Sequence, residues 1–420
     1  MYYARGSYIS NGDGLQGDAE DGYDANAQAQ DPKEPRRENS ADYFFLDHEL
    51  DLTARLLVTD KTRVVVNFEI HDESWLGDPV VSSHTAGNNL DDNIEFKRVF
   101  SSHTFDAYGT VLDLGLMTGA AWGTSFGDTA TGKYRIKVTQ PTEIGPVIAI
   151  YEKNHEEGSV NPDVDDAEKD DAQGVALAMV TKLGDVNIMP LIQYVDDSSA
   201  VLDRGSDGVD VLVFALAATG TFGDIGFESE FVVKDYDRGD LSDQVDDGTL
   251  PFGSDEDYTV WGLYGNGWWN IGAGKVGLLA AYGSWDDDSG KGFGMGDDFE
   301  PALFAANQAD VGGGIGEFYG VSVVQLYGSL ALSEELSING SGLYWASNAK
   351  EQADGEDNFW RDSDGYEINA GLAWKLTDQV TYSAAAAFGK WSLDSNDNND
   401  ANGDSPDGFV RAYHKFQIDF

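Results

Sequence analysis

The chain has 420 residues and a formal net charge of −49, from 75 acidic and 26 basic side chains. Such a charge excludes a nucleic-acid binder, because it would repel the phosphates, and a content of 41% hydrophobic and 12% aromatic residues excludes a disordered acidic chain. There is no cysteine, which excludes disulfides, thiolate metal sites and thiol catalysis.

Short turns alternate with long acidic loops along the chain. The short turns are rich in Gly, Asp and other residues typical of tight β-hairpins, and they fall at 59–62, 106–109, 142–145, 183–185, 222–224, 271–274, 333–336 and 376–379. The long loops cover roughly 11–42, 76–92, 120–131, 155–172, 197–208, 239–256, 286–317, 349–363 and 394–406. Eight turns and nine loops make 17 connections and therefore 18 strands. This alternation predicts an all-β, antiparallel, up-and-down transmembrane barrel rather than a soluble sandwich or propeller, because Greek-key connections give no reason for it.

The segments between these connections alternate apolar and polar residues, as strands between lipid and water do. In segment 43–58, Leu50, Leu52 and Leu56 share one face, while Asp51 and Arg55 lie on the other. The next segment places Val64, Val66, Phe68 and Ile70 outward. No run of 18 or more apolar residues occurs, so no transmembrane helix is expected. Aromatic residues near the segment ends are expected to form interfacial girdles, among them Tyr43, Trp75, Trp261, Trp268, Trp269, Trp345, Trp374, Tyr382 and Trp391.

The last segment alternates Phe416, Ile418 and Phe420 with polar residues. A terminal Phe after such a strand resembles the assembly signal of Gram-negative outer-membrane barrels, and the layout resembles a porin. A count of 18 strands is similar to specific and alginate-export-type channels. The resemblance implies one integral outer-membrane barrel domain over 1–420, surrounded by lipid, with short periplasmic turns and long acidic extracellular loops. It also implies a homotrimer; small residues in 277–283, 338–345 and 384–389 suit either a neighbouring subunit or a segment lying against the wall.

Cations gather on one predicted side of the barrel interior. Lys133, Arg135 and Lys137 share one face of their segment, and each would cost about 2–4 kcal/mol on the lipid face near the midplane. With the neighbouring segments and the closing seam, the expected basic wall is Arg5, Arg55, Arg63, Lys97, Lys133, Arg135, Lys137, Arg411 and Lys415. The alternative is that these cations pair with acids on adjacent strands, such as Asp47, Glu49, Asp51 and Glu69.

Acids are expected on the opposite side of the pore, where Glu228 and Glu230 turn inward. The loop 292–314 is unusually apolar, and folding into the lumen would bury it and hold Asp297, Asp298 and Glu300 in the pore. The third loop, 120–131, is short but offers Trp122, Phe126 and Asp128. We favour 292–314 as the constriction; the alternative is that it packs on a neighbouring subunit.

These features indicate an outer-membrane porin for passive diffusion of small hydrophilic solutes and ions. Cations facing acids would orient dipolar solutes, and the acidic loops would concentrate cations at the mouth, which favours weak or cation-favouring selectivity. The alternatives are a substrate-specific channel, for example for an anionic saccharide, and a non-conducting surface scaffold or adhesin.

The sequence carries no enzyme signature and predicts no cofactor. Its six histidines are isolated, and neither a G-x-S-x-G motif nor a P-loop occurs. Asp- and Asn-rich stretches suit Ca²⁺ and lie at 163–171, 243–248, 284–290 and 394–404. The alternative for these stretches is a solvated, self-repelling surface.

Overall fold

The structure is a computed structural model. It describes residues 2–10, 42–77, 94–119, 121–127, 131–156, 171–197, 209–238, 257–286, 289, 291–296, 299–301, 319–349, 363–392 and 409–419.

Strands make up nearly all of the regular structure. The first half holds β1 (Tyr2–Ser10), β2 (Asp42–Leu57), β3 (Thr62–Gly77), β4 (Ile94–Phe105), β5 (Thr110–Gly119), the short 3₁₀ helix η3 (Ser125–Gly127), β6 (Thr131–Gln140), β7 (Val147–Glu156), β8 (Asp171–Met179), β9 (Thr181–Leu183) and β10 (Val186–Asp197). The second half holds β11 (Val209–Phe222), β12 (Ile225–Arg238), β13 (Tyr258–Ile271), β14 (Gly274–Gly283), β15 (Trp285–Asp286), β16 (Lys291–Gly292), β17 (Val321–Ala331), β18 (Leu336–Ser347), β19 (Asp364–Lys375), β20 (Val380–Ser392) and β21 (Phe409–Ile418). No helix in the described ranges is long and apolar enough to cross a membrane.

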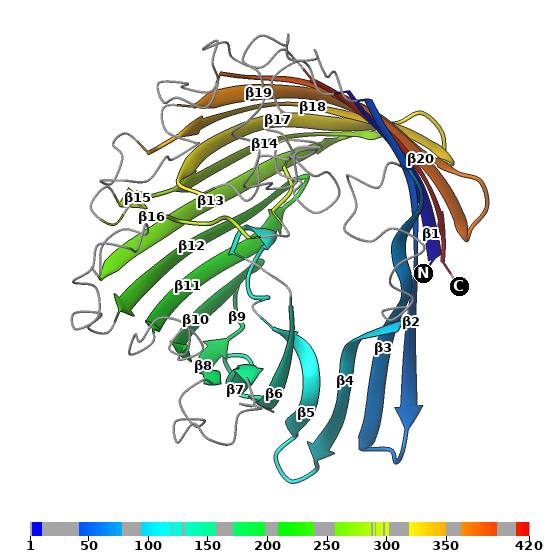
Figure 1. The fold of residues 1–420 in the computed structure, drawn as a ribbon. Coiled ribbons are helices and arrows are strands. Elements are labelled where there is room, and N and C mark those ends of the chain that lie inside the picture. Colours follow the sequence, from blue (N-terminus) through cyan, green and yellow to red (C-terminus); the bar gives the residue numbers. More distant parts are fainter. Residues whose placement is uncertain are drawn as a thin grey trace, which may run out of the picture.

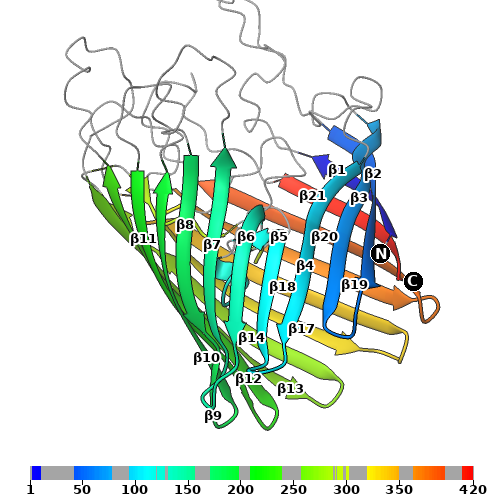
Figure 2. The ribbon, with the colours of Figure 1, turned by 90° about the horizontal axis from the view of Figure 1, so that it is seen from below.

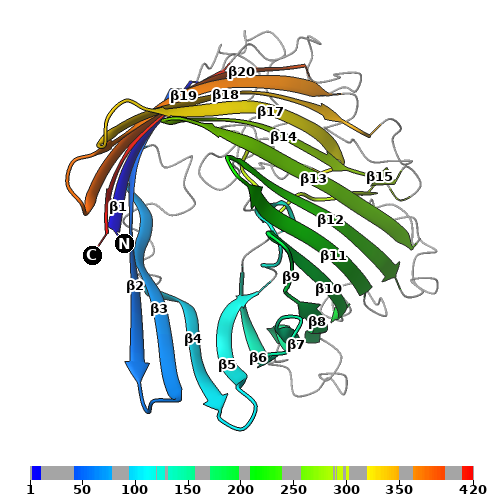
Figure 3. The same cartoon turned by 180° about the vertical axis from the view of Figure 1, so that it is seen from behind.

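The strands close into a ring in which each pairs antiparallel with its neighbours (Figure 1). The first and last strands complete it, with Tyr2 opposite Ile418 and Ser10 opposite Val410. Figure 3 shows the two termini together at this seam. The main sheet contains 19 strands, but β8 and β9 both pair with β10 and form one interrupted strand. The wall therefore has the 18 strands that the connections predicted.

Tight turns join the strands at one end of the barrel (Figure 2). Gly109, Gly184, Gly223 and Gly272 lie in these turns, and each has a positive φ between 59° and 65°. A residue with a side chain adopts this left-handed conformation less easily, which explains the glycines at the predicted turn positions.

Apolar side chains cover the outer face of the wall. On β14, Leu278 is 55% exposed, whereas its neighbours Gly277 and Leu279 are buried on the inner side. Leu56 and Ile136 are likewise 58% and 46% exposed. A barrel in water would not leave alternate apolar side chains uncovered around its circumference, but a barrel in lipid does. The alternation is thus that of a transmembrane barrel.

The expected aromatic girdle is right for some residues and wrong for others. Trp261, Trp269 and Trp374 are exposed on the outer face. Trp345 is fully buried, and it lies opposite the buried Val323 on the inner face. Its closeness to a loop suggested a place at the membrane–water interface. The face on which a strand residue lies, however, depends on whether its position along the strand is odd or even. Trp268 is inward for the same reason. The side chains of Trp75 and Trp391 lie outside the described part.

The C-terminal strand places Phe416 and Ile418 on the outer face, where both side chains are partly exposed. Phe420 lies outside the described residues. The role of these residues as an assembly signal stays a prediction.

Candidate functional site: the inner face of the barrel

The cations of β6 lie on the inner face of the wall. Lys133, Arg135 and Lys137 are partly buried, while Tyr134 and Ile136 between them are exposed on the outer face. The alternation seen in the sequence is therefore the alternation of the folded strand.

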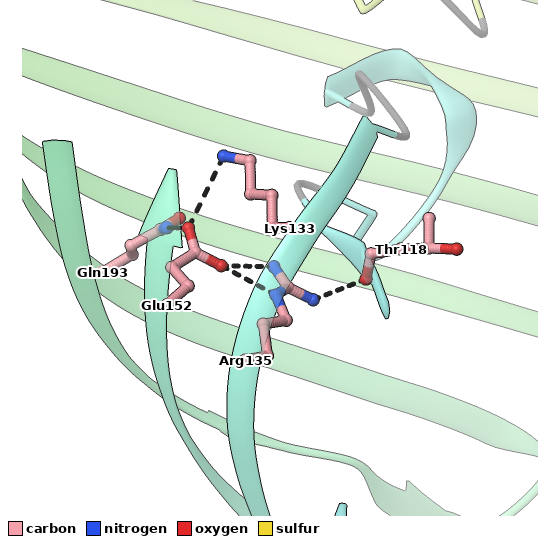
Figure 4. A network of polar contacts seen from close by, with 5 residues as sticks. All are labelled: Thr118, Lys133, Arg135, Glu152 and Gln193. Atoms are coloured by element: carbon pink, nitrogen blue, oxygen red, sulfur yellow. Dashed lines mark hydrogen bonds and ion pairs between the residues drawn. The ribbon is translucent and has the colours of Figure 1, made fainter. Parts of the chain in front are cut away.

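One buried carboxylate holds two of these cations. Glu152 on β7 is 1% exposed, and its Oε2 accepts hydrogen bonds from Arg135 Nε at 2.8 Å and Nη2 at 2.5 Å. Its Oε1 lies 3.5 Å from Lys133 Nζ and accepts a 2.7 Å hydrogen bond from Gln193 Nε2 on β10 (Figure 4). Arg135 Nη1 also donates to the Thr118 carbonyl at 2.7 Å. Two cations share one carboxylate, so this cluster keeps one positive charge.

Two glycines give this cluster its space. A Cβ on Gly119 would lie 2.4 Å from Lys133 Cδ, so any larger residue there would displace the lysine stem. Gly174 on β8 lies between β7 and β10, and a Cβ there would come within 3.3 Å of Glu152 Cγ. Glu152 therefore reaches Gln193 across β8, whose residue opposite Glu152, Gly174, has no side chain.

Glu152 was not among the residues predicted to line the pore. The signal was present, because counting outward from the turn at 142–145 in an antiparallel hairpin places residue 152 opposite Arg135, as the register shows. Gln193 is not found in this way, since its contact spans two strand spacings.

Other cations of the predicted basic wall also pair with neighbouring acids. Lys137 Nζ lies 3.0 Å from Asp113 Oδ2, and Lys97 forms an ion pair with the buried Glu69. Pairing with adjacent acids, the alternative considered above, therefore holds for these two. This part of the interior is mixed in charge.

The remaining basic residues lie beside the β2–β3 turn and at the seam between β1 and β21. Arg55 and Arg63 are exposed near the short turns, and Lys415 is half-buried. Arg5 lies opposite Lys415 in the β1–β21 register, and Arg411 lies opposite Ile9. Their role in permeation stays a prediction.

The two inward acids of β12 are bound to protein donors. Glu230 is 2% exposed and accepts a hydrogen bond from the Thr124 backbone N–H at 2.8 Å and another from its hydroxyl. Glu228 accepts from Asn266 Nδ2 at 3.0 Å and from the Tyr264 hydroxyl. Glu300 is exposed, whereas Asp297, Asp298 and Asp128 lie outside the described residues. Glu230 thus anchors the third loop.

Segments from both candidate loops meet on the inner face. Phe126 is fully buried and stacks on Tyr264 of β13, with 5.5 Å between ring centroids, and on Phe293, at 5.3 Å. Phe299 meets it edge-on at 5.5 Å, and Gly296 N–H donates to the Phe126 carbonyl at 2.8 Å. Described residues of both candidate loops therefore share this position: the favoured loop 292–314 is joined there by residues 121–127 of the third loop.

Small wall residues make room for these rings. A Cβ on Gly262 would lie 2.4 Å from Phe293 Cε1 and 2.7 Å from Phe126 Cζ. Gly283 lies directly opposite Gly262 and faces the Phe293 backbone. Of the two explanations offered for small residues here, this position illustrates the second, in which a segment lies against the wall.

The third loop crosses the interior instead of following the wall. Gly119 ends β5 and Thr124 binds Glu230 on β12, six strand spacings away through β6, β7, β8, β10 and β11. At ~4.8 Å per spacing this arc is about 29 Å, whereas five extended residues span at most about 18 Å. The loop must therefore bridge the ring, on the inner side of β10 to β13 (Figure 1).

The predicted calcium stretches lie mostly outside the described residues; only 171, 284–286 and 289 are described. In the described part of the chain, no group of three or more His, Cys, Asp or Glu side chains is placed to hold a metal ion.

Comparison with solved structures places this arrangement among outer-membrane porins. The chain resembles the outer-membrane protein OpdK of Pseudomonas aeruginosa (TM-score 0.51, 8% identity, 99% of this chain and 97% of that chain). It also resembles OccAB3 of Acinetobacter baumannii (TM-score 0.52, 9% identity, 100% and 98%) and OccK2 of P. aeruginosa, solved with glucuronate (TM-score 0.52, 8% identity, 99% and 96%). No family model and no curated sequence matches the chain. The chain thus has the full-length fold of an integral outer-membrane porin of about 18 strands, as predicted.

Proposed function

We propose that this protein is an outer-membrane channel through which small hydrophilic solutes and ions diffuse passively. The observation that carries the proposal is a closed ring of strands with an apolar outer face and a charged inner face, against which residues 121–127 lie on the inner side. A barrel of about 18 strands is wide enough for an aqueous lumen.

Conductance in a planar lipid bilayer tests this proposal directly. A purified full-length protein that forms a channel gives discrete, ohmic steps in potassium chloride. If the protein inserts and stays silent at all voltages, the channel proposal fails and the non-conducting scaffold becomes the better explanation.

A substrate-specific channel for carboxylate solutes is the second candidate. The cluster around Glu152 keeps one positive charge beside the constricting segment, and such a charge attracts anions. Two structures of similar fold were solved with glucuronate and with vanillate, both of which are carboxylates. The net charge of −49 opposes the entry of anions, and this favours general diffusion over a channel specific for carboxylates. Concentration-dependent block of the current by glucuronate, but not by an equal concentration of chloride, would favour this second candidate.

We further propose a homotrimer. Small outward residues support it, because Gly340, Ala370 and Ala386 lie opposite one another on neighbouring strands and would let a second copy approach closely. Native mass spectrometry from detergent tests the proposal, and a single-copy mass would contradict it.

A further inference from the structure

Two aromatic residues and two glycines alternate along one row of the inner face. Gly226 on β12 lies opposite Trp268 on β13, Trp268 opposite Gly277 on β14, and Gly277 opposite Tyr327 on β17. Directly opposed residues point to the same side of a sheet, so the row lies on one face.

Each ring lies over the glycine beside it. A Cβ on Gly226 would be 2.3 Å from Trp268 Cε2, and a Cβ on Gly277 would be 2.2 Å from Tyr327 Cζ. The rings therefore occupy the space that side chains at these glycines would fill, and they lean in the same direction along the row. We call Trp268 and Tyr327 the aromatic platform. Its rings lie about two strand spacings apart, or ~10 Å.

The Lys275 ammonium lies within cation–π distance of both rings. Lys275 Nζ is 5.8 Å from the Trp268 centroid and 5.4 Å from the Tyr327 centroid. Lys275 is an exposed side chain, and no acidic group in the described ranges forms an ion pair with it. Each ring therefore contacts a positively charged group, and both aromatic side chains are only partly buried.

Hydrogen-bonding groups border the platform on the side of the constriction. Asn266 accepts a 2.8 Å hydrogen bond from the Tyr327 hydroxyl and donates a 3.0 Å bond to Glu228 Oε1. The Tyr264 hydroxyl donates to the same oxygen, so both described donors to Glu228 use Oε1. An ionised carboxylate offers further acceptor sites and no donor. A ligand beside Glu228 must therefore bring hydroxyl or amino hydrogens.

The platform lies directly beyond the constriction. On β13, the ring of Tyr264 stacks against Phe126. The next inward residues along the strand are Asn266 and Trp268, and Trp268 lies nearest the short turn that follows Ile271. A solute that passes residues 121–127 towards the short-turn end would meet the platform.

We propose that this platform binds a saccharide, and specifically a neutral one. This inference rests on the proposed channel function and names a class of solute for it. A sugar ring has an apolar face that packs on Trp268 and Tyr327, and its hydroxyls are donors as well as acceptors, as Glu228, Asn266 and Lys275 together require. Lys275 and Glu228 balance in charge, so the site has no net preference for an anion.

The test measures the block of single-channel current by maltotriose in planar bilayers, using the full-length protein. Trp268→Ala is compared with Trp269→Ala, which removes the same side chain from the outer face one residue along the strand, where Trp269 is 53% exposed. We expect maltotriose to block the unsubstituted channel and the Trp269→Ala channel at similar concentrations. For Trp268→Ala, loss of a buried aromatic contact predicts about tenfold weaker block. Conductance in potassium chloride alone shows that each variant is folded.

Four outcomes overturn the inference, and they differ in what else they affect. A protein that conducts but is not blocked by maltotriose has no saccharide platform, although the channel proposal stands. Block by glucuronate but not by maltotriose would show that the channel binds anionic solutes and not neutral saccharides. Equal weakening in both tryptophan variants would place binding away from the inner face. Absence of any conductance would remove the channel proposal together with the inference.

Discussion

Substitution of Glu152 by Gln is expected to shift the ion selectivity of the channel towards anions. Glu152 is the one carboxylate shared by Lys133 and Arg135, and Gln keeps its shape while removing its charge. The cluster then changes from one net positive charge to two. Because the charges lie on the inner face beside the crossing loop, a permeating ion passes near them.

The size of the shift follows from Coulomb's law. An ion about 5 Å from the added charge gains or loses about 0.8 kcal/mol in water, and screening at 0.1 M salt reduces this to about 0.5 kcal/mol. That energy changes the local concentration of anions and of cations about twofold each, in opposite directions, and the ratio of the two about fivefold. At 1 M salt the Debye length is ~3 Å, and the same ratio changes by less than about twofold.

The assay is the reversal potential of single channels in a salt gradient, measured at low and at high salt. Lys133→Gln removes one cation from the same cluster and should shift the potential in the opposite direction. Asp106→Asn serves as the matched control, because Asp106 pairs with Lys61 between two short turns, away from the inner face. Conducting Glu152→Gln channels without a shift would show that the cluster does not border the permeation path. A shift that survives at high salt would show that screened Coulomb attraction is not its cause.

Three further predictions concern the constriction and the wall. Thr124→Val removes the hydroxyl that binds the buried Glu230, so the crossing loop should loosen and the single-channel current should become noisier at unchanged barrel stability; an unchanged noise spectrum would contradict this. Gly262→Val places atoms where the rings of Phe126 and Phe293 now lie and should raise conductance by displacing them. The control Gly265→Ala, whose Cβ meets nothing within 4 Å, should have no effect. Equal conductance in the two variants would refute the packing of these rings on Gly262. Ile136→Lys puts a charge on the outer face and should lower the free energy of unfolding by about 2–4 kcal/mol. The measurement is the urea midpoint of unfolding in lipid vesicles, which should be lower than for Ile136→Ala. Equal midpoints would mean that this face does not contact lipid.

Local patterns predicted much of the fold. The alternation of apolar and polar residues depends only on the two-residue period of a strand, so the outward position of Ile136 and the inward position of Lys133 could be read directly. Turn chemistry is equally local, which is why the connections yielded 18 strands. The face of Trp345 was misjudged because its nearness to a loop was weighed above its parity.

The interior was only partly predictable. A hairpin register relates Arg135 to Glu152 by counting from their turn, and the sequence contained that information. Nothing local relates Phe126 to Phe293, or Thr124 to Glu230, because these residues come from different loops and strands and meet only across the closed ring.

The sequence by itself determined that the chain forms strands with one apolar and one polar face, how many there are, and which side chains turn inward. Each of these follows from short-range periodicity and backbone preferences. The tertiary structure alone decided that Gln193 reaches Glu152 from two strands away, that residues of two loops meet on the inner face, and that Trp268 and Tyr327 lie over glycines on one row. Those depend on the register between strands distant in the chain and on the space their side chains leave, which no local pattern encodes.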